Sequence, residues 1–172
     1  MKTLVVIDVQ NDFITGSLGS KEAQKKIPAI IEKIKTGAWD RIAVTQDTHE
    51  HNYMDTQEGK YLPVPHCIRA TNGWKIDPEV QKALREAKAD VVYLLKPTFG
   101  SFELPDACKG STEIEIIGFC TDICVISNAI ILKTAFYDTA KITVDSNCCS
   151  GVSPEKHEAA LEVLRSCQIE VK

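Results

Sequence analysis

The sequence predicts an α/β protein in three layers, an α/β/α arrangement with a central parallel sheet of about six strands. Two observations lead to this prediction. Short, nearly continuous apolar runs rich in β-branched residues recur along the chain, and segments with helical spacing of apolar residues separate them. This alternation is typical of right-handed strand–helix–strand units and of a Rossmann-like topology. With 172 residues, the chain fits a single domain, residues 1–172.

The apolar runs are short enough to be strands and apolar enough to be buried on both faces of a sheet. In chain order they lie at residues 4–7, 42–45, 91–95, 114–117, 142–144 and, most weakly, 169–171. Their alternation with helical segments indicates that they belong to one parallel sheet.

The predicted helices show stripes of apolar residues three or four positions apart. The stripes are Ile27, Ile30, Ile31 and Ile34; Val80, Ala83, Leu84 and Ala87; Ile126, Ala129 and Ile130; and Ala160, Leu161 and Leu164. Two of these helices have clear start signals at 77–79 and 153–155. Each signal offers an N-cap residue (Asp77 or Ser153), then a proline and an acid in the first turn.

Composition and charge exclude several classes of protein. Hydrophobic residues make up 44% of the chain and charged residues 26%, as in globular proteins rather than disordered tails. The net charge is −4, and the acidic and basic residues are mixed, which leaves no basic stripe for nucleic acid. No apolar run approaches the roughly 20 residues that span a bilayer. Asp8 and Gln10 interrupt the apolar start where a signal peptide would continue. We expect a cytoplasmic protein without nucleic-acid or membrane partners.

The cysteines argue against a disulfide framework. The chain has seven, an odd number, and they form no paired C-x-x-C motif that would indicate a structural zinc cluster. We expect most of them to be small buried hydrophobes, and one or two at most to be chemically special.

Three chemically distinctive residues stand at the carboxyl ends of predicted strands, where ligands bind in parallel α/β sheets. Cys124 follows the fourth strand, in the first turn of a helix that Thr121 or Asp122 could cap, and a helix N-terminus lowers the pKa of a thiol. Asp8 could act as general base for that thiol, and Lys96 could pair with Asp8 and favour the thiolate. The structural alternatives are a packed cysteine, a turn-capping carboxylate and a solvated lysine.

A candidate metal site lies in the long, polar, irregular segment after the second strand. Asp47 and His49 form an Asp-x-His pair there, and His66 follows at a distance. One carboxylate and two imidazoles suit zinc, iron or manganese and leave positions open for substrate. Glu58 could be a further ligand, whereas His51 is expected to point elsewhere. The alternative is a set of surface histidines on a polar loop.

Aromatic residues could form the wall of a pocket for a flat substrate. The candidates are Phe13, Phe99, Trp74 and Tyr61, and each could equally pack in the core or under a loop. His157 lies among charged neighbours in a predicted helix, so we expect it to be solvated.

In combination these features resemble the isochorismatase-like cysteine hydrolases and, within them, the nicotinamidases. The resemblance covers nearly the whole chain. Its motifs are, in order, Asp8-Val9-Gln10-Asn11-Asp12-Phe13, Asp47-Thr48-His49, Leu62-Pro63-Val64-Pro65-His66-Cys67, Lys96, and Gly118-Phe119-Cys120-Thr121-Asp122-Ile123-Cys124-Val125. Several ordered motifs are far more specific than any one of them.

The resemblance assigns a catalytic triad to Asp8, Lys96 and Cys124. It also implies a cis peptide bond between Phe119 and Cys120, and an oxyanion hole formed by the N–H groups of Cys120 and Cys124.

The resemblance further implies a site for one divalent metal ion, with Asp47, His49 and His66 as ligands and Glu58 as a possible fourth. Zinc is the expected ion, and iron or manganese would also suit these ligands.

The implied reaction is hydrolysis of nicotinamide to nicotinate and ammonia through a cysteine thioester, a step of NAD salvage and pyridine nucleotide biosynthesis. The metal would orient the pyridine ring, and Phe13, Phe99 and Leu62 would contact it. The substrate partner is then a small-molecule amide, and the fold commonly forms a homo-oligomer. Phe99 stands where some relatives have a hydroxyl-bearing aromatic residue, and the segment before His66 lacks a tryptophan often seen there, so the pocket wall departs from the family pattern.

Two other interpretations remain. The first is another hydrolase on this scaffold, acting on a ureido, carbamoyl or vinyl-ether group; such relatives generally lack the complete set of one aspartate and two histidines. The second is a non-catalytic binding protein, in which the nucleophile or base is usually lost. All three triad positions are occupied here.

Overall fold

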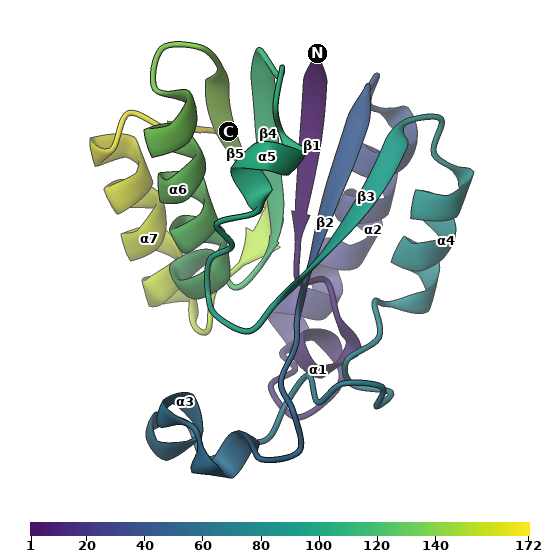
Figure 1. Ribbon diagram of the computed structural model, residues 1–172, viewed down its shortest axis with the longest axis vertical. Coiled ribbons are helices and arrows are strands. Elements are labelled where there is room, and N and C mark those ends of the chain that lie inside the picture. Colours follow the sequence, from purple (N-terminus) through teal and green to yellow (C-terminus); the bar gives the residue numbers. More distant parts are fainter.

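The computed structural model describes residues 1–172 and contains one sheet of six parallel strands, as predicted (Figure 1). The strand order is β3-β2-β1-β4-β5-β6, so β1 lies near the middle and the chain winds outward from it in both directions. The strands are β1 (Lys2–Ile7), β2 (Arg41–Asp47), β3 (Asp90–Lys96), β4 (Glu113–Phe119), β5 (Lys141–Ser150) and β6 (Glu170–Val171).

Helices cover both faces of the sheet. One face packs against α2 and α4, and the other against α5, α6 and α7 (Figure 1). Short elements gather at the carboxyl ends of the strands, at the lower end of Figure 1. None of the helices combines the length and the apolar composition needed to span a bilayer. The helices are α1 (Asn11–Ile14), α2 (Lys21–Thr36), η1 (Tyr53–Asp55), α3 (Gln57–Tyr61), α4 (Pro78–Glu86), α5 (Leu104–Ala107), η2 (Thr121–Val125), α6 (Ile126–Phe136) and α7 (Pro154–Ser166).

Local sequence signals start three of these helices. Asp77 accepts hydrogen bonds from two backbone N–H groups at the start of α4, and Ser153 accepts one at the start of α7, as their positions before proline predict. Ser20 caps α2 in the same way. Each cap satisfies backbone donors that have no partner within the helix.

The central strand holds the site in place. Along β1 the side chains of Leu4 and Val6 pack toward α2 and α4, and those of Val5 and Ile7 pack toward the opposite helices. All four are fully buried. Each buried side chain of this size contributes about 1.5–3 kcal/mol relative to an exposed one, so β1 is firmly anchored between its neighbours.

Strands β1 and β4 remain paired up to the last residue of β1. Ile7 pairs with Gly118, whose φ angle is +121°. A Cβ atom at this position would lie 2.0 Å from the Ile7 carbonyl oxygen. Glycine is therefore required here by both the backbone conformation and the contact.

Two predicted strands differ in the structure. The run at 91–95 is not buried on both faces, because β3 is an edge strand; Tyr93 is 43% exposed and Leu95 41% exposed. Strand β5 is ten residues long and continues past the predicted run at 142–144. Its second half contains Asp145 and Asn147. Because their polar side chains interrupt the apolar pattern, the sequence did not predict this part of the strand.

The cysteines are all free, and five of the seven are buried, as expected for small hydrophobic residues.

Candidate active site

Asp8 lies where β1 ends at the middle of the sheet. Its φ angle is +49°, which turns the chain away from the sheet toward α1. The side chain is fully buried. Oδ1 accepts a hydrogen bond from the Thr45 hydroxyl at 2.7 Å, and Oδ2 faces the Lys96 ammonium at 2.6 Å without any further donor. This carboxylate is therefore held by two partners and is not a surface turn cap.

Lys96 is the last residue of β3, and only 1% of its surface is exposed. Its Nζ lies 2.6 Å from Asp8 Oδ2, 3.5 Å from Asp47 Oδ1 and 3.5 Å from Cys124 Sγ. It also donates to the Thr98 carbonyl at 3.0 Å. The solvated-lysine alternative is wrong, and the ammonium joins the three predicted triad side chains into one group. We call Asp8, Lys96 and Cys124 the thiol cluster.

Cys124 lies in η2, the turn between β4 and α6, and is buried. The predicted capping of this turn is wrong, because neither Thr121 nor Asp122 caps it. Asp122 Oδ1 accepts from Val152 N at 2.9 Å, a contact with the segment after β5. Residues distant in the sequence, which the local pattern does not reveal, hold the turn in place.

His157 is partly buried in α7 rather than solvated as expected. Its Nδ1 lies 2.8 Å from the hydroxyl of Thr121 in η2. Burial lowers the pKa of His157 below its ordinary value. The histidine thus supports the turn that carries Cys124.

The Phe119–Cys120 peptide bond is cis, as the family resemblance implies. It lies immediately before η2. The Cys120 carbonyl accepts hydrogen bonds from the N–H groups of Ile123 and Val125, which close the turn around Cys124.

The pKa of the Cys124 thiol is raised rather than lowered, contrary to the expectation from its place near a helix start. Burial raises its pKa well above the ordinary value and the Asp8 carboxylate adds to this, whereas Lys96 opposes it. Burial also raises the pKa of Asp8, and Lys96 offsets only part of that shift. Burial disfavours the charged form of Lys96, but its anionic neighbours, Asp8 first, outweigh burial and raise its pKa. The cluster combines a thiol, an available base and a fixed cation.

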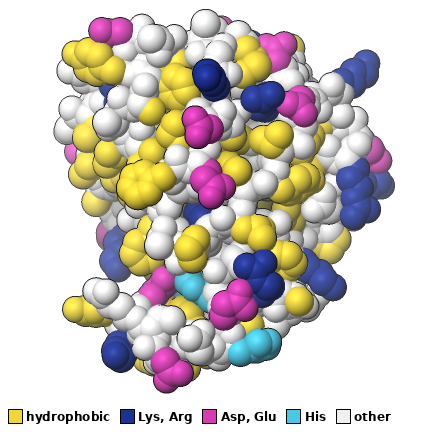
Figure 2. Space-filling model, viewed as in Figure 1, with side chains coloured by type: hydrophobic (Ala, Val, Ile, Leu, Met, Phe, Trp, Pro, Cys, Tyr) yellow, Lys and Arg dark blue, Asp and Glu magenta, His cyan; other side chains and the backbone are white.

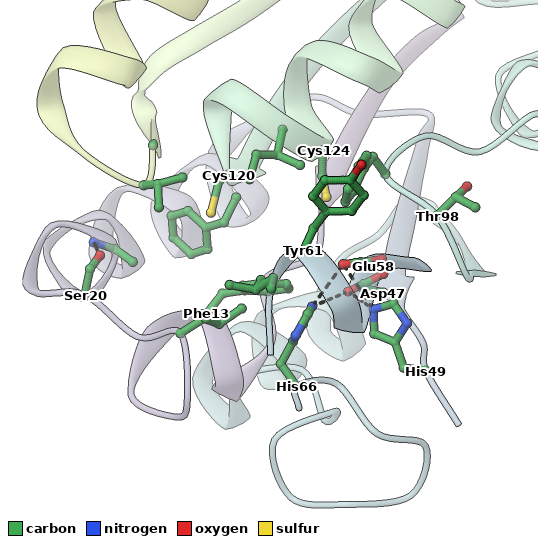
Figure 3. Close-up of a pocket in the computed structure, with 18 of the residues that line it drawn as sticks. Phe13, Ser20, Asp47, His49, Glu58, Tyr61, His66, Thr98, Cys120 and Cys124 are labelled. Carbon is green, nitrogen blue, oxygen red and sulfur yellow. Dashed lines mark hydrogen bonds and ion pairs between the residues drawn. The ribbon is translucent and has the colours of Figure 1, made fainter. Parts of the chain in front are cut away.

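Asp47, His49 and His66 come together as predicted, with one ligand atom from each within 4.8 Å of the others. His49 Nε2 lies 3.0 Å and His66 Nε2 3.4 Å from Asp47 Oδ2, and Glu58 Oε1 lies 3.7 and 3.6 Å from the same two nitrogens (Figure 3). The His66 Nδ1 lies 2.9 Å from the Val64 carbonyl, which directs Nε2 inward. These oxygen and nitrogen donors, of which those of Asp47, His49 and His66 are buried, fit a divalent metal ion. We call Asp47, His49, Glu58 and His66 the metal-ligand cluster.

The charges of this cluster suit a cation. Burial opposes ionisation of Asp47, but hydrogen bonds with His49 and His66 outweigh it and hold the pKa of the carboxyl well below its usual range. Burial raises the pKa of Glu58. Figure 2 shows histidine and acidic side chains near each other at the end of the molecule where α3 lies.

Gln10, which the sequence analysis did not select, fixes the backbone of Asp47. Its Oε1 accepts from Asp47 N at 2.8 Å, and its Nε2 donates to the carbonyls of Asp47 at 2.9 Å and Trp74 at 2.8 Å. Strand β1 has already ended here, while β2 continues to Asp47. The carboxamide of Gln10 therefore bonds both the N–H and the carbonyl of Asp47, as the backbone of a neighbouring strand would. In the sequence, Gln10 stands directly after a buried strand and within the first motif of the family resemblance, but neither signal indicates that it binds the backbone of Asp47.

Asp12 supports the backbone next to His66 in a similar way. Its Oδ2 accepts from Cys67 N at 2.8 Å, next to His66, and its Oδ1 accepts from Ser17 N at 3.3 Å. A Cβ atom on Gly73 would lie 2.0 Å from Asp12 Oδ2, so the glycine leaves room for this carboxylate.

One cavity of about 1040 Å³ contains both Cys124 and the metal-ligand cluster (Figure 3). Phe13, Phe99 and Leu62 all line it, as the resemblance implies, and so does Tyr61. Trp74 does not, because its indole N–H donates to the Thr48 hydroxyl. The cavity also has an end that the sequence analysis missed, formed by Leu18, Gly19, Ser20, Ala23, Gly151, Val152 and Lys156.

A parallel α/β sheet that brings a thiol, a carboxylate and an ammonium group together at the carboxyl ends of its strands fits a class of α/β enzymes that hold their reactive side chains at this edge of the sheet. The comparison with protein families agrees with this class. A model described as the isochorismatase domain matches residues 2–171, and the chain belongs to the isochorismatase family.

Known relatives cover almost the whole chain. An isochorismatase family protein of Bacillus subtilis is 30% identical over 176 residues, which cover 93% of this chain and 92% of that protein. The nicotinamidase/pyrazinamidase of Mycobacterium tuberculosis is 27% identical over 188 residues, covering 99% and 98%. The crystal structure of the pyrazinamidase of Pyrococcus horikoshii in complex with zinc has a TM-score of 0.78 and 28% identity, covering 99% of this chain and 98% of that one.

Proposed function

We propose that this protein hydrolyses nicotinamide to nicotinate and ammonia through a thioester intermediate on Cys124. The observation that carries the proposal is the shared cavity: Cys124 and all four members of the metal-ligand cluster line the same space. The similarity to the nicotinamidase/pyrazinamidase of Mycobacterium tuberculosis supports the choice of substrate.

Asp47, His49 and His66 would hold one divalent ion, with Glu58 as a fourth ligand. When bound, the ion supplies a Lewis-acid position for the ring nitrogen and so orients the carboxamide. Zinc is the first choice, because a similar pyrazinamidase was solved in complex with zinc. Iron and manganese suit the same ligands.

The thiol cluster performs the covalent chemistry. Asp8 Oδ2 takes the proton from Cys124 Sγ and becomes neutral, while Lys96 remains an ammonium ion and stabilises the thiolate. The thiolate then attacks the amide carbon. The N–H groups of Cys120 and Cys124 would stabilise the oxyanion that forms.

Asp8 also transfers the protons in the two later steps, the release of ammonia and the hydrolysis of the thioester. Asp8 donates its proton to the amide nitrogen, the carbon–nitrogen bond breaks, and ammonia leaves a thioester on Cys124. Asp8 next takes a proton from water, and the resulting hydroxide attacks the thioester carbon. The carbon–sulfur bond breaks, nicotinate leaves, and the proton returns to the thiol.

The cavity wall would accommodate a flat ring. Phe13 is largely buried beside His66, with ring centroids 5.7 Å apart, and Phe99 and Leu62 are partly exposed on other parts of the wall. Aromatic and aliphatic faces of this kind exclude water from a pyridine ring and orient it.

The deciding experiment measures ammonia release from nicotinamide by the purified protein, before and after removal of metal by a chelator. We expect fast release that is lost on chelation and restored by zinc. No release by the metal-loaded protein would overturn the nicotinamide assignment and direct the search to ureido or carbamoyl substrates. The homo-oligomer and the cytoplasmic location stay predictions, and gel filtration tests the first.

A further inference from the structure

The side chain of Asn128 connects the helix after Cys124 to the wall of the cavity. Asn128 lies in α6, four residues after Cys124, and is fully buried. Its Nδ2 donates to the carbonyl oxygens of Cys124 at 2.8 Å and Phe99 at 3.1 Å, and its Oδ1 accepts from Ser101 N at 2.9 Å. One amide thus satisfies three backbone groups.

Two of these backbone groups belong to residues 97–101, which we call the wall segment. This segment leaves the end of β3 and crosses the start of α6, and its residues Thr98 and Phe99 line the cavity. A Cβ atom on Gly100 would lie 2.6 Å from Ile131 Cδ1, so the segment rests directly on α6. The Thr98 hydroxyl donates to the Gly100 carbonyl at 2.8 Å and keeps the segment compact.

The wall segment also controls the orientation of the ammonium group in the thiol cluster. Lys96 Nζ donates to the Thr98 carbonyl at 3.0 Å, and its other neighbours are Asp8, Asp47 and the Cys124 thiol. An ammonium group has only three N–H donors. The Thr98 carbonyl anchors one of these donors outside the carboxylates. If the wall segment moved, the ammonium group would lose this anchor and could shift toward the two carboxylates, which are stronger acceptors than sulfur.

We infer that Asn128 is a positioning residue for the reaction at Cys124. It holds the wall segment against α6, and the wall segment in turn keeps the Lys96 ammonium directed at the sulfur. Asn128 itself touches no reacting atom. The inference rests on the proposed function for its kinetic measurement, but not for the chemical labelling described next.

The test compares Asn128→Ala and Asn128→Leu with the wild-type protein. Leucine keeps the side-chain volume but removes every hydrogen bond. Comparison of the two variants therefore distinguishes the effect of the lost hydrogen bonds from the effect of an empty cavity. The first measurement is the rate of Cys124 alkylation by iodoacetamide at fixed pH, followed by mass spectrometry of the peptide. We expect both variants to react about tenfold more slowly, and kcat for nicotinamide to fall by roughly 10- to 100-fold with a smaller change in KM.

Ser127→Ala is the matched control. Its hydroxyl donates to the Ile123 carbonyl within the same helical turn and makes no hydrogen bond to the wall segment. We expect its alkylation rate and kcat to equal those of the wild type. Wild-type alkylation and kcat in both Asn128 variants, with only a lower melting temperature, would overturn the inference. Equal slowing in Ser127→Ala would overturn it too. If the wild type does not hydrolyse nicotinamide, the proposed function fails while the labelling comparison still decides the role of Asn128.

Discussion

The Lys96 ammonium lies 2.6 Å from Oδ2 of Asp8, and both side chains are almost completely removed from solvent. Neither charge has water to stabilise it, so each depends on the other. The second carboxylate near the ammonium group is that of Asp47, with Oδ1 at 3.5 Å. The same pair therefore determines both the stability of the sheet centre and the protonation of the thiol.

Lys96→Met should destabilise the protein strongly. Removing one member of a buried ion pair leaves the other charge uncompensated, which costs about 3–5 kcal/mol. Urea unfolding of the metal-free protein would measure the change. The double variant Asp8→Asn/Lys96→Met removes both charges and should recover part of the loss. A single variant as stable as the wild type would show that the pair does not contribute to stability.

The two cysteines of the nucleophile turn should respond oppositely to alanine. Cys124→Ala removes the proposed nucleophile, so kcat should fall by about 10⁴-fold or more. Cys120→Ala should retain activity close to that of the wild type, because the proposed role of Cys120 belongs to its backbone N–H. Ammonia release measures both. Full turnover by Cys124→Ala would contradict the covalent mechanism.

Gln10→Ala should weaken metal binding although Gln10 is not itself a ligand. The variant removes both hydrogen bonds that hold the Asp47 peptide, and losses of this kind typically lower metal affinity by about 10- to 100-fold. Zinc competition with a coloured chelator gives the affinity. Gln24→Ala is the control, since its amide donates to the Ile14 carbonyl, away from the site. Unchanged affinity in Gln10→Ala would show that Asp47 needs no such support.

His157 should make the protein less stable as the pH drops from 7 to 5. Burial lowers the pKa of this imidazole in the folded protein below its ordinary 6.5, so the unfolded chain binds the proton more readily. Stability is then lost as the pH falls from above the unfolded pKa toward the folded one. His157→Gln should reduce the slope in a series of urea titrations, and an identical slope would rule this contribution out.

The sequence predicted the strands and the meeting of Asp8, Lys96 and Cys124, for one physical reason. Apolar runs must be buried, and the carboxyl ends of parallel strands lie at one edge of the sheet. Asp47 and His66 of the metal-ligand cluster were predicted through their donor chemistry, with the family resemblance as support, and the structure places them together.

What the sequence could not show depends on contacts between distant segments. The raised pKa of Cys124 results from burial and from the facing Asp8, which the local helix-start argument ignores. The roles of Gln10 and Asn128 depend on backbone groups far away in the chain. The contact of His157 with Thr121 is also long-range.

The pairing of Ile7 with Gly118 has a consequence for how the site could change over time. Asp8, Lys96 and the metal-ligand cluster come before Gly118 in the chain, on or after β1, β2 and β3, whereas Cys124 comes after it. The backbone pairing of β1 with β4 therefore sets how far the base stands from the sulfur, in addition to the contacts that both make with Lys96. Gly118 is thus a position where any other residue would disturb the spacing of the site, although it carries no reactive group.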